Sequence, residues 1–519
     1  MTVRFEPAAP AGGPPAAGAY AAAMAAQAGR AFPATAAEAL VPAPGEAAAR
    51  ARDALLGGRA LAVTTGQQPG LFTGPLYTLH KALTSVALAE ALAARWGRSV
   101  VPVFWVAGDD HDFAEINHCA VVSVEGEVRR IELRERPAGA PMLPAYRESV
   151  APGGDEALTA LEGALPPSDF RAETLAWLRA AYRPERSMAE AFAVALADLL
   201  APFGVVVCRG WHGDLKRAAA PLVLEALRSA RTLDDALARE AAALRERGRE
   251  PVVAVGEGLG LAMVEAASGR DRLRIEADGF ATRRSGERFS LADLEALAQA
   301  SPERLSANVL LRPVVEASLI PTVAYVGGPA ELGYLGQVAP LFAHLAVPRP
   351  VPTPRLSGFV VEAKVDKSLE RLGLTPADLA RPEGELTSAL AREALPADAA
   401  AALGALRAGI GERWAAVREA AVRLERTLER PVDTARNQAL HAADEIEKRL
   451  VSALKRSNEA ALQQLARARV HLFPDGRPQE RVLTAATYLA RHGRPLIGML
   501  HDAARAHVAR LLEAAPAGT

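Results

Sequence analysis

Three carboxylates and one imidazole occupy four consecutive positions of this sequence: Asp109, Asp110, His111 and Asp112. Groups crowded in this way are costly unless they serve a site or remain solvated. They follow Val100–Val106, an apolar run that predicts a buried strand, and open α/β sheets bind ligands beyond the carboxyl ends of their strands. The cluster therefore predicts catalytic residues that act as a general base, anchor Mg²⁺ beside nucleotide phosphates, or bind a transition metal.

Two further polar side chains follow this cluster. Asn117 and His118 are candidate binding residues on the same segment. His111 and His118 stand seven positions apart, which is not a recognisable zinc-binding spacing, so no dedicated metal site is predicted. An exposed acidic loop remains the alternative interpretation of the whole segment.

A glycine-rich loop, Thr65–Pro75, follows an earlier apolar strand, Ala60–Thr64. Glycines after a strand let backbone N–H groups approach a ligand, and the N-terminus of the following helix favours an anion. His80 and Lys81, on that helix, are candidate catalytic residues that could meet a phosphate or a carboxylate. The loop is neither a Walker A motif nor a dinucleotide-binding fingerprint, and a turn that only packs helix on strand is the alternative. Its candidate binding residues are Gly66, Gln67, Gln68, Gly70, Thr73 and Gly74.

A third segment repeats this arrangement. The predicted strand Pro321–Val326 ends in a Gly-Gly-Pro loop that opens a helix with Glu331 in its first turn. Glu331 either serves the site or complements the helix dipole. The guanidinium of Arg312 is suited to clamp a carboxylate or phosphate bidentately, or it forms a structural ion pair. The candidate binding residues here are Arg312, Tyr325, Gly327, Gly328, Glu331 and Tyr334.

The elements that carry these loops predict an α/β core. The first strand, a helix with apolar positions through 79–92 and the second strand form a βαβ unit, which implies a right-handed crossover onto a parallel sheet. Phe203–Cys208 predicts a further core strand. Pro251–Val255 and Leu273–Glu276 predict a pair of strands, whereas 347–355, with four prolines, predicts a segment without regular structure.

The pattern changes after residue 400. Apolar residues recur three and four positions apart from Leu403 to Leu428, Pro431 breaks the run, and a second run extends from Ile446 to Leu465. Two long charged helices about one proline predict an antiparallel coiled-coil hairpin. The predicted organisation is an N-terminal Ala/Pro-rich segment with helices (1–59), a Rossmann-like catalytic core (60–365), the hairpin arm (366–470) and helices that return to the core (471–519).

Composition limits the class of protein. The length of 519 residues suggests two or three domains, and 60 basic against 61 acidic side chains create no bulk field that would attract nucleic acid or a membrane surface. Because Cys119 and Cys208 are the only cysteines, a reducing compartment fits. The chain starts without the apolar core of a signal peptide, and the uncharged stretch Pro7–Gly29 is too rich in Ala, Gly and Pro to span a membrane. We therefore expect a soluble cytoplasmic protein.

These segments, in this order, resemble the bacillithiol-biosynthesis cysteine-adding enzymes, a family of cysteine ligases. The similarity extends from residue 60 to residue 492. Two positions depart from the family pattern: Asp109 stands where Glu is more usual, which keeps the carboxylate, and Pro69 replaces a small residue. The matching segments are Thr65–Lys81, Val101–His118, Leu311–Pro313, Tyr325–Glu331 and Leu472–Arg481.

The resemblance implies a Rossmann-like core, a coiled-coil arm that forms a homodimer, and addition of cysteine to glucosaminyl-malate in the last step of bacillithiol synthesis. The product is an amide, whose formation is uphill in water, so ATP with Mg²⁺ would activate the carboxylate as an acyl phosphate or acyl adenylate. In this hypothesis His80 and Lys81 help the glycine-rich loop to hold anionic groups. Asp110 or His111 takes the proton of the attacking amine, and Arg312 fixes a carboxylate.

Two other classes of function compete with this one. The first is a nucleotidyl transferase that acts on a small carboxylate at a similar sheet edge, which pyrophosphate release without cysteine would identify. The second is a noncatalytic assembly protein in which the coiled-coil arm is the functional part. Ligation by a core that lacks the arm would exclude this second alternative.

Overall fold

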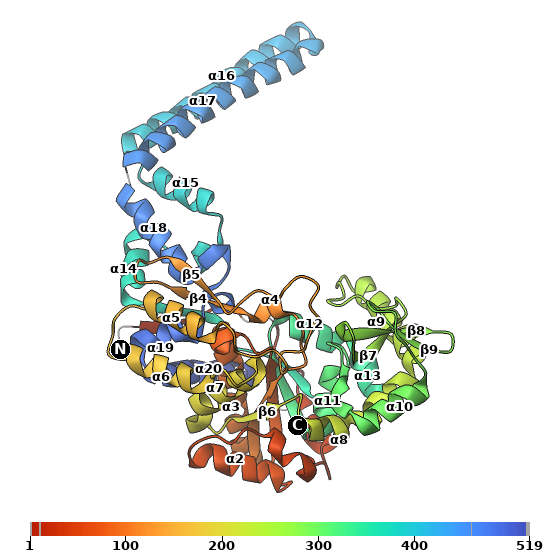
Figure 1. Ribbon diagram of the computed structural model, residues 1–519. Helices are drawn as coiled ribbons and strands as arrows, with labels where there is room; N and C mark the ends of the chain where they lie inside the picture. Colours follow the sequence, from red (N-terminus) through yellow and green to blue (C-terminus); the bar gives the residue numbers. More distant parts are fainter. Residues whose placement is uncertain (1–2, 10–11, 458, 515–519) are drawn as a thin grey trace. The chain divides into compact units, whose positions relative to one another are not determined.

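The structure, a computed structural model, describes residues 3–9, 12–457 and 459–514 (Figure 1). The chain forms two compact units. One comprises Val3–Val360 with Gln479–Thr519, and the other comprises Val361–Pro478. The first unit contains two five-stranded sheets, and the second is built mainly of helices.

Helices make up much of the first unit. None of the helices in the described ranges is long and apolar enough to cross a membrane. Those of the first unit are α1 (Ala19–Ala26), α2 (Glu46–Leu56), α3 (Tyr77–Trp96), α4 (Phe113–Ile116), α5 (Gly154–Ala164), α6 (Arg171–Ala181), α7 (Met188–Leu200), α8 (Gly213–Arg228), α9 (Ala230–Glu246), α10 (Leu291–Ala300), α11 (Arg312–Leu319), α12 (Pro329–Gln337), α13 (Ala339–His344), α19 (Ala485–His492) and α20 (Pro495–Glu513).

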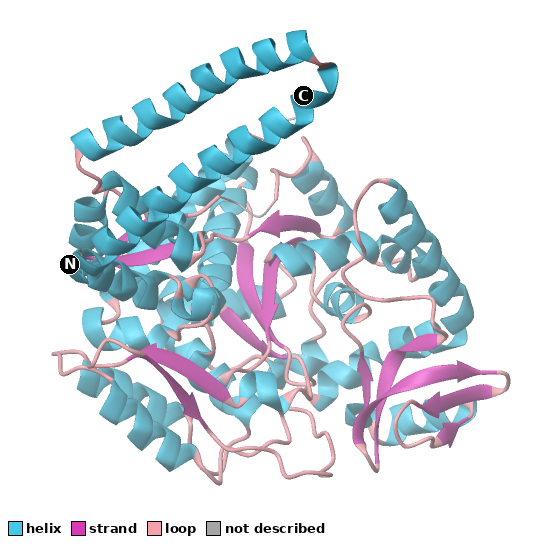
Figure 2. Ribbon diagram, turned by 90° about the horizontal axis from the view of Figure 1, so that it is seen from above, coloured by secondary structure: helices cyan, strands magenta, loops and turns pink. Residues whose placement is uncertain are grey.

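A parallel sheet of five strands forms the centre of this unit (Figure 2). Its order is β13-β12-β2-β3-β6, and all neighbours are parallel. The chain adds β3 and β6 on one side of β2, then β12 and β13 on the other, so the order reverses between β2 and β12. A sheet of this kind opens a ligand crevice where its order reverses. The strands are β2 (Leu61–Gln67), β3 (Val100–Val106), β6 (Val206–Arg209), β12 (Thr322–Gly327) and β13 (Val351–Pro354).

Helices cover both faces of the parallel sheet, which confirms the predicted α/β class. On one face α3 packs against β2 and β3, and Phe104 of β3 contacts Phe192 of α7 with ring centroids 6.2 Å apart. On the other face Trp105 joins a core with side chains of α2, α8 and α11. Successive residues of β3 therefore point to opposite faces, and both are buried, as in a parallel sheet covered on both sides.

The second sheet is antiparallel, with the order β10-β9-β8-β7-β11. α8 and α9 pack against β7, and α10 contacts β10 (Figure 1). The prediction of a strand at Leu273–Glu276 is confirmed, since these residues form the second half of β8. The strands are β7 (Leu259–Ala266), β8 (Gly269–Glu276), β9 (Gly279–Thr282), β10 (Arg288–Phe289) and β11 (Leu305–Ala307).

The prediction of a strand at Pro251–Val255 is wrong, because β8 pairs with β7 instead. The side-chain amide of Gln337 binds the backbone of Val253, accepting from its N–H at 3.2 Å and donating to its carbonyl at 2.7 Å. Gly256 and Gly258 then turn the chain with φ angles of 80° and 68°. A distant side chain thus satisfies the backbone groups that a neighbouring strand would otherwise have bonded.

The prediction that 347–355 lacks regular structure is wrong for its second half. β13 pairs with β12 from Val351 opposite Ala324 to Pro354 opposite Gly327. Proline has no N–H to offer a second neighbour, so it is tolerated in an edge strand. Because β13 is the outermost strand of the sheet, its prolines cost no ladder hydrogen bond on the open side.

The second unit contains the predicted coiled-coil hairpin, formed by α16 and α17. The sequence places the break at Pro431, which is wrong by about one turn. A short 3₁₀ segment, Arg426–Leu428, separates the two helices, and Pro431 lies in the first turn of α17, where its missing N–H needs no partner. The helices of this unit are α14 (Ala363–Leu372), α15 (Glu383–Glu393), α16 (Ala397–Leu424), α17 (Glu429–Ser457) and α18 (Glu459–Leu472).

The loop that follows β2 has an unusual backbone. Phe72, Thr73 and Gly74 have φ angles of 48°, 73° and 65°, a conformation that is unfavourable for the two residues with side chains. The buried hydroxyl of Tyr182 accepts the N–H of Thr73 at 2.9 Å and donates to the carbonyl of Gly70 at 3.2 Å. A tyrosine from α6's C-terminal end therefore fixes the shape of this loop.

Tyr182→Phe removes that hydroxyl and leaves the buried N–H of Thr73 without a partner. We expect the free energy of unfolding to fall by about 1–3 kcal/mol, measured by urea denaturation. Tyr20→Phe is the matched control, because among the described residues its hydroxyl bonds only to that of Thr353, which keeps a bond to the carbonyl of Val351. The control should lose about 1 kcal/mol or less. Equal losses would contradict the role given to Tyr182.

Candidate active site

A cavity of about 550 Å³ lies in the first unit, at the carboxyl ends of β2, β3 and β12, and extends to β7 and β11. Its volume falls in the range of small-molecule sites, about 300–1,000 Å³. All three segments predicted to carry the site contribute to it. The predicted residues that line the cavity are Gly66, Gln67, Gln68, Lys81, Asp109, Asp110, His111, Arg312, Tyr325, Gly328, Glu331 and Tyr334.

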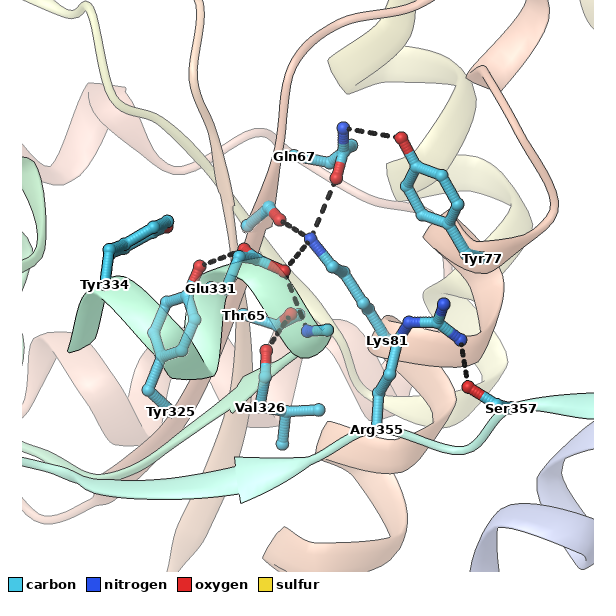
Figure 3. Close-up of polar contacts among 12 residues, drawn as sticks. Thr65, Gln67, Tyr77, Lys81, Tyr325, Val326, Glu331, Tyr334, Arg355 and Ser357 are labelled. Atoms are coloured by element: carbon cyan, nitrogen blue, oxygen red, sulfur yellow. Dashed lines mark hydrogen bonds and ion pairs between the residues drawn. The ribbon is translucent and has the colours of Figure 1, made fainter. Parts of the chain in front are cut away.

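Lys81 connects two of these segments (Figure 3). Its buried ammonium lies 2.9 Å from the carbonyl of Gly66, 2.8 Å from Oε1 of Gln67 and 2.5 Å from Oε2 of Glu331. An ammonium has three protons, so the protein itself uses all of them. Burial lowers the pKa of Lys81, and Glu331 offsets this only in part. Lys81 therefore ties the end of β2 to the start of α12, and an anion would reach it only by displacing one of these partners.

Glu331 is bound from three sides. In addition to Lys81, its carboxylate accepts hydrogen bonds from the hydroxyl of Tyr325 at 2.8 Å and from the N–H of Gly328 at 2.9 Å. Burial raises the pKa of Glu331, but Lys81 and these hydrogen bonds outweigh it and hold the pKa below its ordinary value. Glu331 is therefore ionised at neutral pH, and it both caps α12 and neutralises Lys81.

Arg312 reaches the cavity, and both of its Nη atoms already have partners. Its Nη1 donates to the buried carboxylate of Glu316 at 2.6 Å. Its Nη2 lies 3.3 Å from the hydroxyl of Tyr325 and 3.0 Å from that of Tyr334. Of the two interpretations of Arg312, the structure shows the ion pair. The predicted clamp would require these tyrosines to give way to a ligand.

Asp110 is an ionised carboxylate in the cavity wall. It accepts hydrogen bonds from Nε2 of Gln68 and, at 3.0 Å, from the N–H of Asp112. Burial raises the pKa of Asp110, but these bonds and the charge of Arg270 outweigh it and leave the pKa below its ordinary value. Asp110 is therefore ionised at neutral pH and can accept a proton.

Several charged residues of the cavity were not predicted from the sequence. Lys216 of α8 donates to both carboxylate oxygens of Asp109 at 2.7 Å and to the carbonyl of Leu305 at 3.4 Å. These contacts use all three protons of its ammonium. No glycine-rich loop marks α8 or β8, so no local signal points to their cations. The missed residues are Lys216, Arg270, Arg272, Arg355 and Arg481.

His111 lines the cavity beside Arg270. Its Nδ1 is 3.2 Å from Nη1 of Arg270. Burial and the positive charge of Arg270 lower the pKa of His111 to about 4, and Asp110 offsets this only in part. The imidazole is therefore uncharged at neutral pH, even though acidic residues adjoin it on both sides in the sequence.

Other predicted residues lie outside the cavity, where they have structural roles. Asp112 caps α4 by accepting the N–H of Glu115 at 3.3 Å. The amide of Asn117 donates to the carbonyl of Arg134 at 2.8 Å and lies 3.1 Å from the ring of His118. Tertiary packing thus brings twelve of the twenty predicted residues to the cavity and leaves eight outside it. The residues outside are Gly70, Thr73, Gly74, His80, Asp112, Asn117, His118 and Gly327.

His80 belongs to a buried ionic network. Its Nδ1 is 2.9 Å from Oε2 of Glu480, which also accepts hydrogen bonds from Arg355 at 3.0 and 2.6 Å on its two oxygens. Burial raises the pKa of Glu480, but His80 and Arg355 hold it well below its usual range. Arg355 lines the cavity, and its guanidinium lies 5.5 Å from the ring centroid of Tyr77. Glu480 therefore fixes a cationic part of the cavity wall from behind.

Arg481, next to Glu480, also lines the cavity, and its side chain is exposed. Within the described part of the chain, no carboxylate or hydrogen-bond partner contacts its guanidinium. Arg481 can therefore bind an anionic ligand without first losing a partner. The segment Leu472–Arg481, quoted above for its family resemblance, is the sequence signal that could have identified it.

Comparison with known proteins identifies relatives of this chain. Residues 39–356 match the family description "Bacillithiol biosynthesis BshC, N-terminal Rossmann-like domain", and residues 358–510 match "Bacillithiol biosynthesis BshC, C-terminal coiled-coil domain". The chain belongs to the BshC family. The resemblance inferred from the sequence and the predicted combination of a Rossmann-like core with a coiled-coil region are confirmed.

Curated BshC relatives, each named "Putative cysteine ligase BshC", cover most of the chain. The protein of Salinibacter ruber is 33% identical over 448 residues, that of Koribacter versatilis 31% over 446, and that of Heliobacterium modesticaldum 34% over 458. The aligned regions span 85–86% of this chain and 81–82% of each relative. Arg481 falls in the C-terminal BshC match, whereas Lys81 and Asp110 fall in the N-terminal one.

Glu480→Gln should destabilise the protein strongly, because it leaves the buried guanidinium of Arg355 without its counter-charge. We expect the free energy of unfolding to fall by about 3–5 kcal/mol, measured with urea at pH 7. Glu46→Gln is the control, since its pair with Arg50 is exposed and should contribute less than about 1 kcal/mol. A loss no larger than that of the control would contradict the assignment.

The pH dependence of this loss follows from the pKa of Glu480, which folding lowers. A carboxylate with a lowered pKa stabilises the fold above the ordinary pKa of glutamate, about 4.3. That stabilisation declines as the pH falls below this value toward the pKa of the folded state. The difference between the wild type and Glu480→Gln should therefore be largest near neutrality and shrink in acid. A difference that grew in acid would count against the network.

Proposed function

We propose that this chain is a ligase that joins cysteine to glucosaminyl-malate through an amide bond, in the last step of bacillithiol synthesis. The observation that carries the proposal is the presence in one cavity of a cation without a counter-ion, Arg481, and an ionised carboxylate, Asp110. The malate part of the acceptor is anionic, and its sugar carries the amine that must lose protons. The names of the relatives support cysteine as the other substrate.

The proposed chemistry forms a C–N bond between the amine of the sugar and the carboxyl carbon of cysteine. One carboxyl oxygen leaves, and the ammonium group of the sugar loses two protons in becoming an amide N–H. Asp110 is ionised and can accept one of these protons. Arg481 can bind a malate carboxylate by charge-assisted hydrogen bonds.

We propose ATP as the source of activation, because amide formation from a carboxylate is uphill in water. ATP would supply that activation at the carboxylate of cysteine. Arg272, whose Nε donates to the carbonyl of Gly260 at 3.0 Å, lines the cavity and adds positive charge suited to phosphates. The volume of about 550 Å³ is compatible with more than one small substrate.

Mg²⁺ would accompany the nucleotide in this proposal. Among the described residues, no three His, Cys, Asp or Glu side chains form a metal-binding group. Mg²⁺ is commonly held by only one or two carboxylates together with substrate phosphates. In this proposal Asp110 serves as the proton acceptor and Lys216 occupies both oxygens of Asp109, so phosphates and water would supply most of the ligands of the ion.

The proposal includes a homodimer formed through the hairpin arm. Leu406, Val417 and Leu424 of α16 are exposed by 44%, 53% and 83%, and Ile446 and Leu450 of α17 by 49% and 37%. The three residues of α16 are spaced by close to whole numbers of helical turns, so they share one face. A second hairpin would remove this apolar stripe from water.

We also propose the cytoplasm as the compartment. Both cysteines, Cys119 and Cys208, are buried thiols rather than a disulfide. Burial raises the pKa of each thiol, which keeps the reactive thiolate form scarce. A protein with buried, unlinked cysteines fits a reducing compartment, where the substrate cysteine also stays reduced.

The dimer predicts that Val417→Glu combined with Leu424→Glu yields a monomer, because charges on the shared stripe would be buried at the interface. Ala415→Glu is the control, since two residues from Val417 place it on the opposite side of α16. Light scattering of the full-length proteins gives the mass of each. A wild-type monomer, or a dimer that survives the double substitution, would contradict the proposed interface.

Mass spectrometry tests the reaction itself. The purified protein is incubated with cysteine, glucosaminyl-malate and Mg²⁺, with and without ATP. We expect the amide product only when ATP is present. Pyrophosphate release without cysteine would favour a nucleotidyl transferase, and a folded dimer that gives no product in either sample would contradict ligation from these substrates.

Arg481→Ala refines this test. Loss of one charge-assisted contact, about 1.5–3 kcal/mol, should raise the KM for glucosaminyl-malate about tenfold or more and leave the KM for cysteine nearly unchanged. Arg477→Ala, which removes an exposed arginine that does not line the cavity, is the control. An equal rise for both substrates would contradict the specific role of Arg481.

A further inference from the structure

Arg270, on β8, is buried in the cavity wall, and each nitrogen of its guanidinium contacts the protein. Its Nε donates to Oγ of Ser306 at 2.9 Å and its Nη2 to the carbonyl of Ala307 at 2.7 Å. Its Nη1 lies 3.2 Å from Nδ1 of His111. A guanidinium stays charged in proteins and has only donors, so in this contact Arg270 must donate.

His111 must therefore accept at Nδ1. An imidazole that accepts at Nδ1 is not doubly protonated, and it carries its single proton on Nε2. His111 lines the cavity, and no described residue forms a hydrogen bond with its Nε2. The ring thus offers an N–H group to a ligand, not a lone pair.

We infer that His111 acts as a neutral hydrogen-bond donor through Nε2, and that Arg270 is the positioning residue that maintains this state. The ligand group that fits is an oxygen that becomes negative during the reaction. This removes His111 from the two candidates for proton acceptor and leaves Asp110. Which oxygen His111 contacts rests on the proposed function, whereas the protonation of its imidazole does not.

The charges around His111 support this assignment. Burial and the positive charges of Arg270 and Arg284 disfavour an imidazolium, and only Asp110 and Asp112 favour it. The balance lowers the pKa to about 4. Arg136 also donates to the backbone carbonyl of His111 at 3.1 Å. The position of the residue and the protonation of its ring are thus both set by arginines from outside the acidic cluster.

In the proposed ligation, negative charge develops on the carboxyl oxygen of cysteine as the amine attacks the carbon. A preorganised neutral N–H can stabilise that charge without giving up its proton. Asp110, next to His111 in the sequence, is ionised and can take the proton from the amine. Two adjacent residues would then serve opposite purposes, one as donor and one as acceptor.

Nuclear magnetic resonance can determine the state of the ring without turnover. The full-length protein is labelled with ¹⁵N in its ten histidines, and the signal lost in His111→Gln identifies His111. We expect the coupling pattern of an Nε2–H tautomer, unchanged between about pH 8 and about pH 5.5. In Arg270→Met, the pKa of His111 should rise toward about 6.5. An Nδ1–H tautomer, or protonation near pH 6.5 in the wild type, would overturn the inference.

The ligation assay separates a donor from a base. His111→Gln places an amide N–H near the position of Nε2, whereas His111→Glu places a carboxylate there. Because loss of such a donor costs about 10²–10³-fold in kcat, we expect His111→Glu to lose that much and His111→Gln to lose at least tenfold less. The reverse order would show a base and overturn the inference. If the wild type does not ligate, the proposed function fails while the resonance result still decides the state of the ring.

Discussion

The geometry of the cavity depends on the ammonium of Lys81. It joins the carbonyl of Gly66 and the side chain of Gln67, at the end of β2, to Glu331 at the start of α12. A buried ion pair is tolerated only when its remaining donors and acceptors are satisfied. Here every ammonium proton has an acceptor, and the carboxylate of Glu331 also accepts hydrogen bonds from Tyr325 and Gly328. The two strand ends that flank the reversal of sheet order are therefore held at a fixed separation before any ligand arrives.

The hydrogen bonds of the lysines and arginines in the cavity wall determine which of these cations can still bind a ligand. Lys81 and Lys216 have all three protons engaged, and Arg312 donates to Glu316 and two tyrosines. These groups give the cavity a rigid wall and a positive potential, but few open donors. Arg481 differs because no described residue neutralises it. A preorganised wall with an exposed, unpaired cation favours an anionic ligand bound in a defined orientation.

The sequence predicts the centre of the parallel sheet well because β2, β3 and β12 each carry a local signal: an apolar run followed by glycine or acidic residues. It fails where a distant group decides the local structure. Gln337 satisfies the backbone of Val253, so an apolar run is not a strand, and an edge position lets the prolines of β13 remain in the sheet. For the same reason Arg270 and Lys216 were missed, since the antiparallel sheet and α8 reach the cavity only through the tertiary fold.

His111 shows that residue type and spacing in the sequence do not determine the charge and tautomer of an imidazole. Its sequence neighbours are carboxylates, which favour an imidazolium, and from them a base or a metal ligand is the natural expectation. The fold places Arg270, 159 positions away in the sequence, against Nδ1 of His111. This one hydrogen-bond donor reverses the expectation of a base or a metal ligand. Because a guanidinium cannot accept, it fixes both the charge and the tautomer of the ring. Asp110, in the acidic cluster, remains the proton acceptor that the proposed reaction needs. Arg270, on β8, makes the adjacent imidazole a hydrogen-bond donor at Nε2.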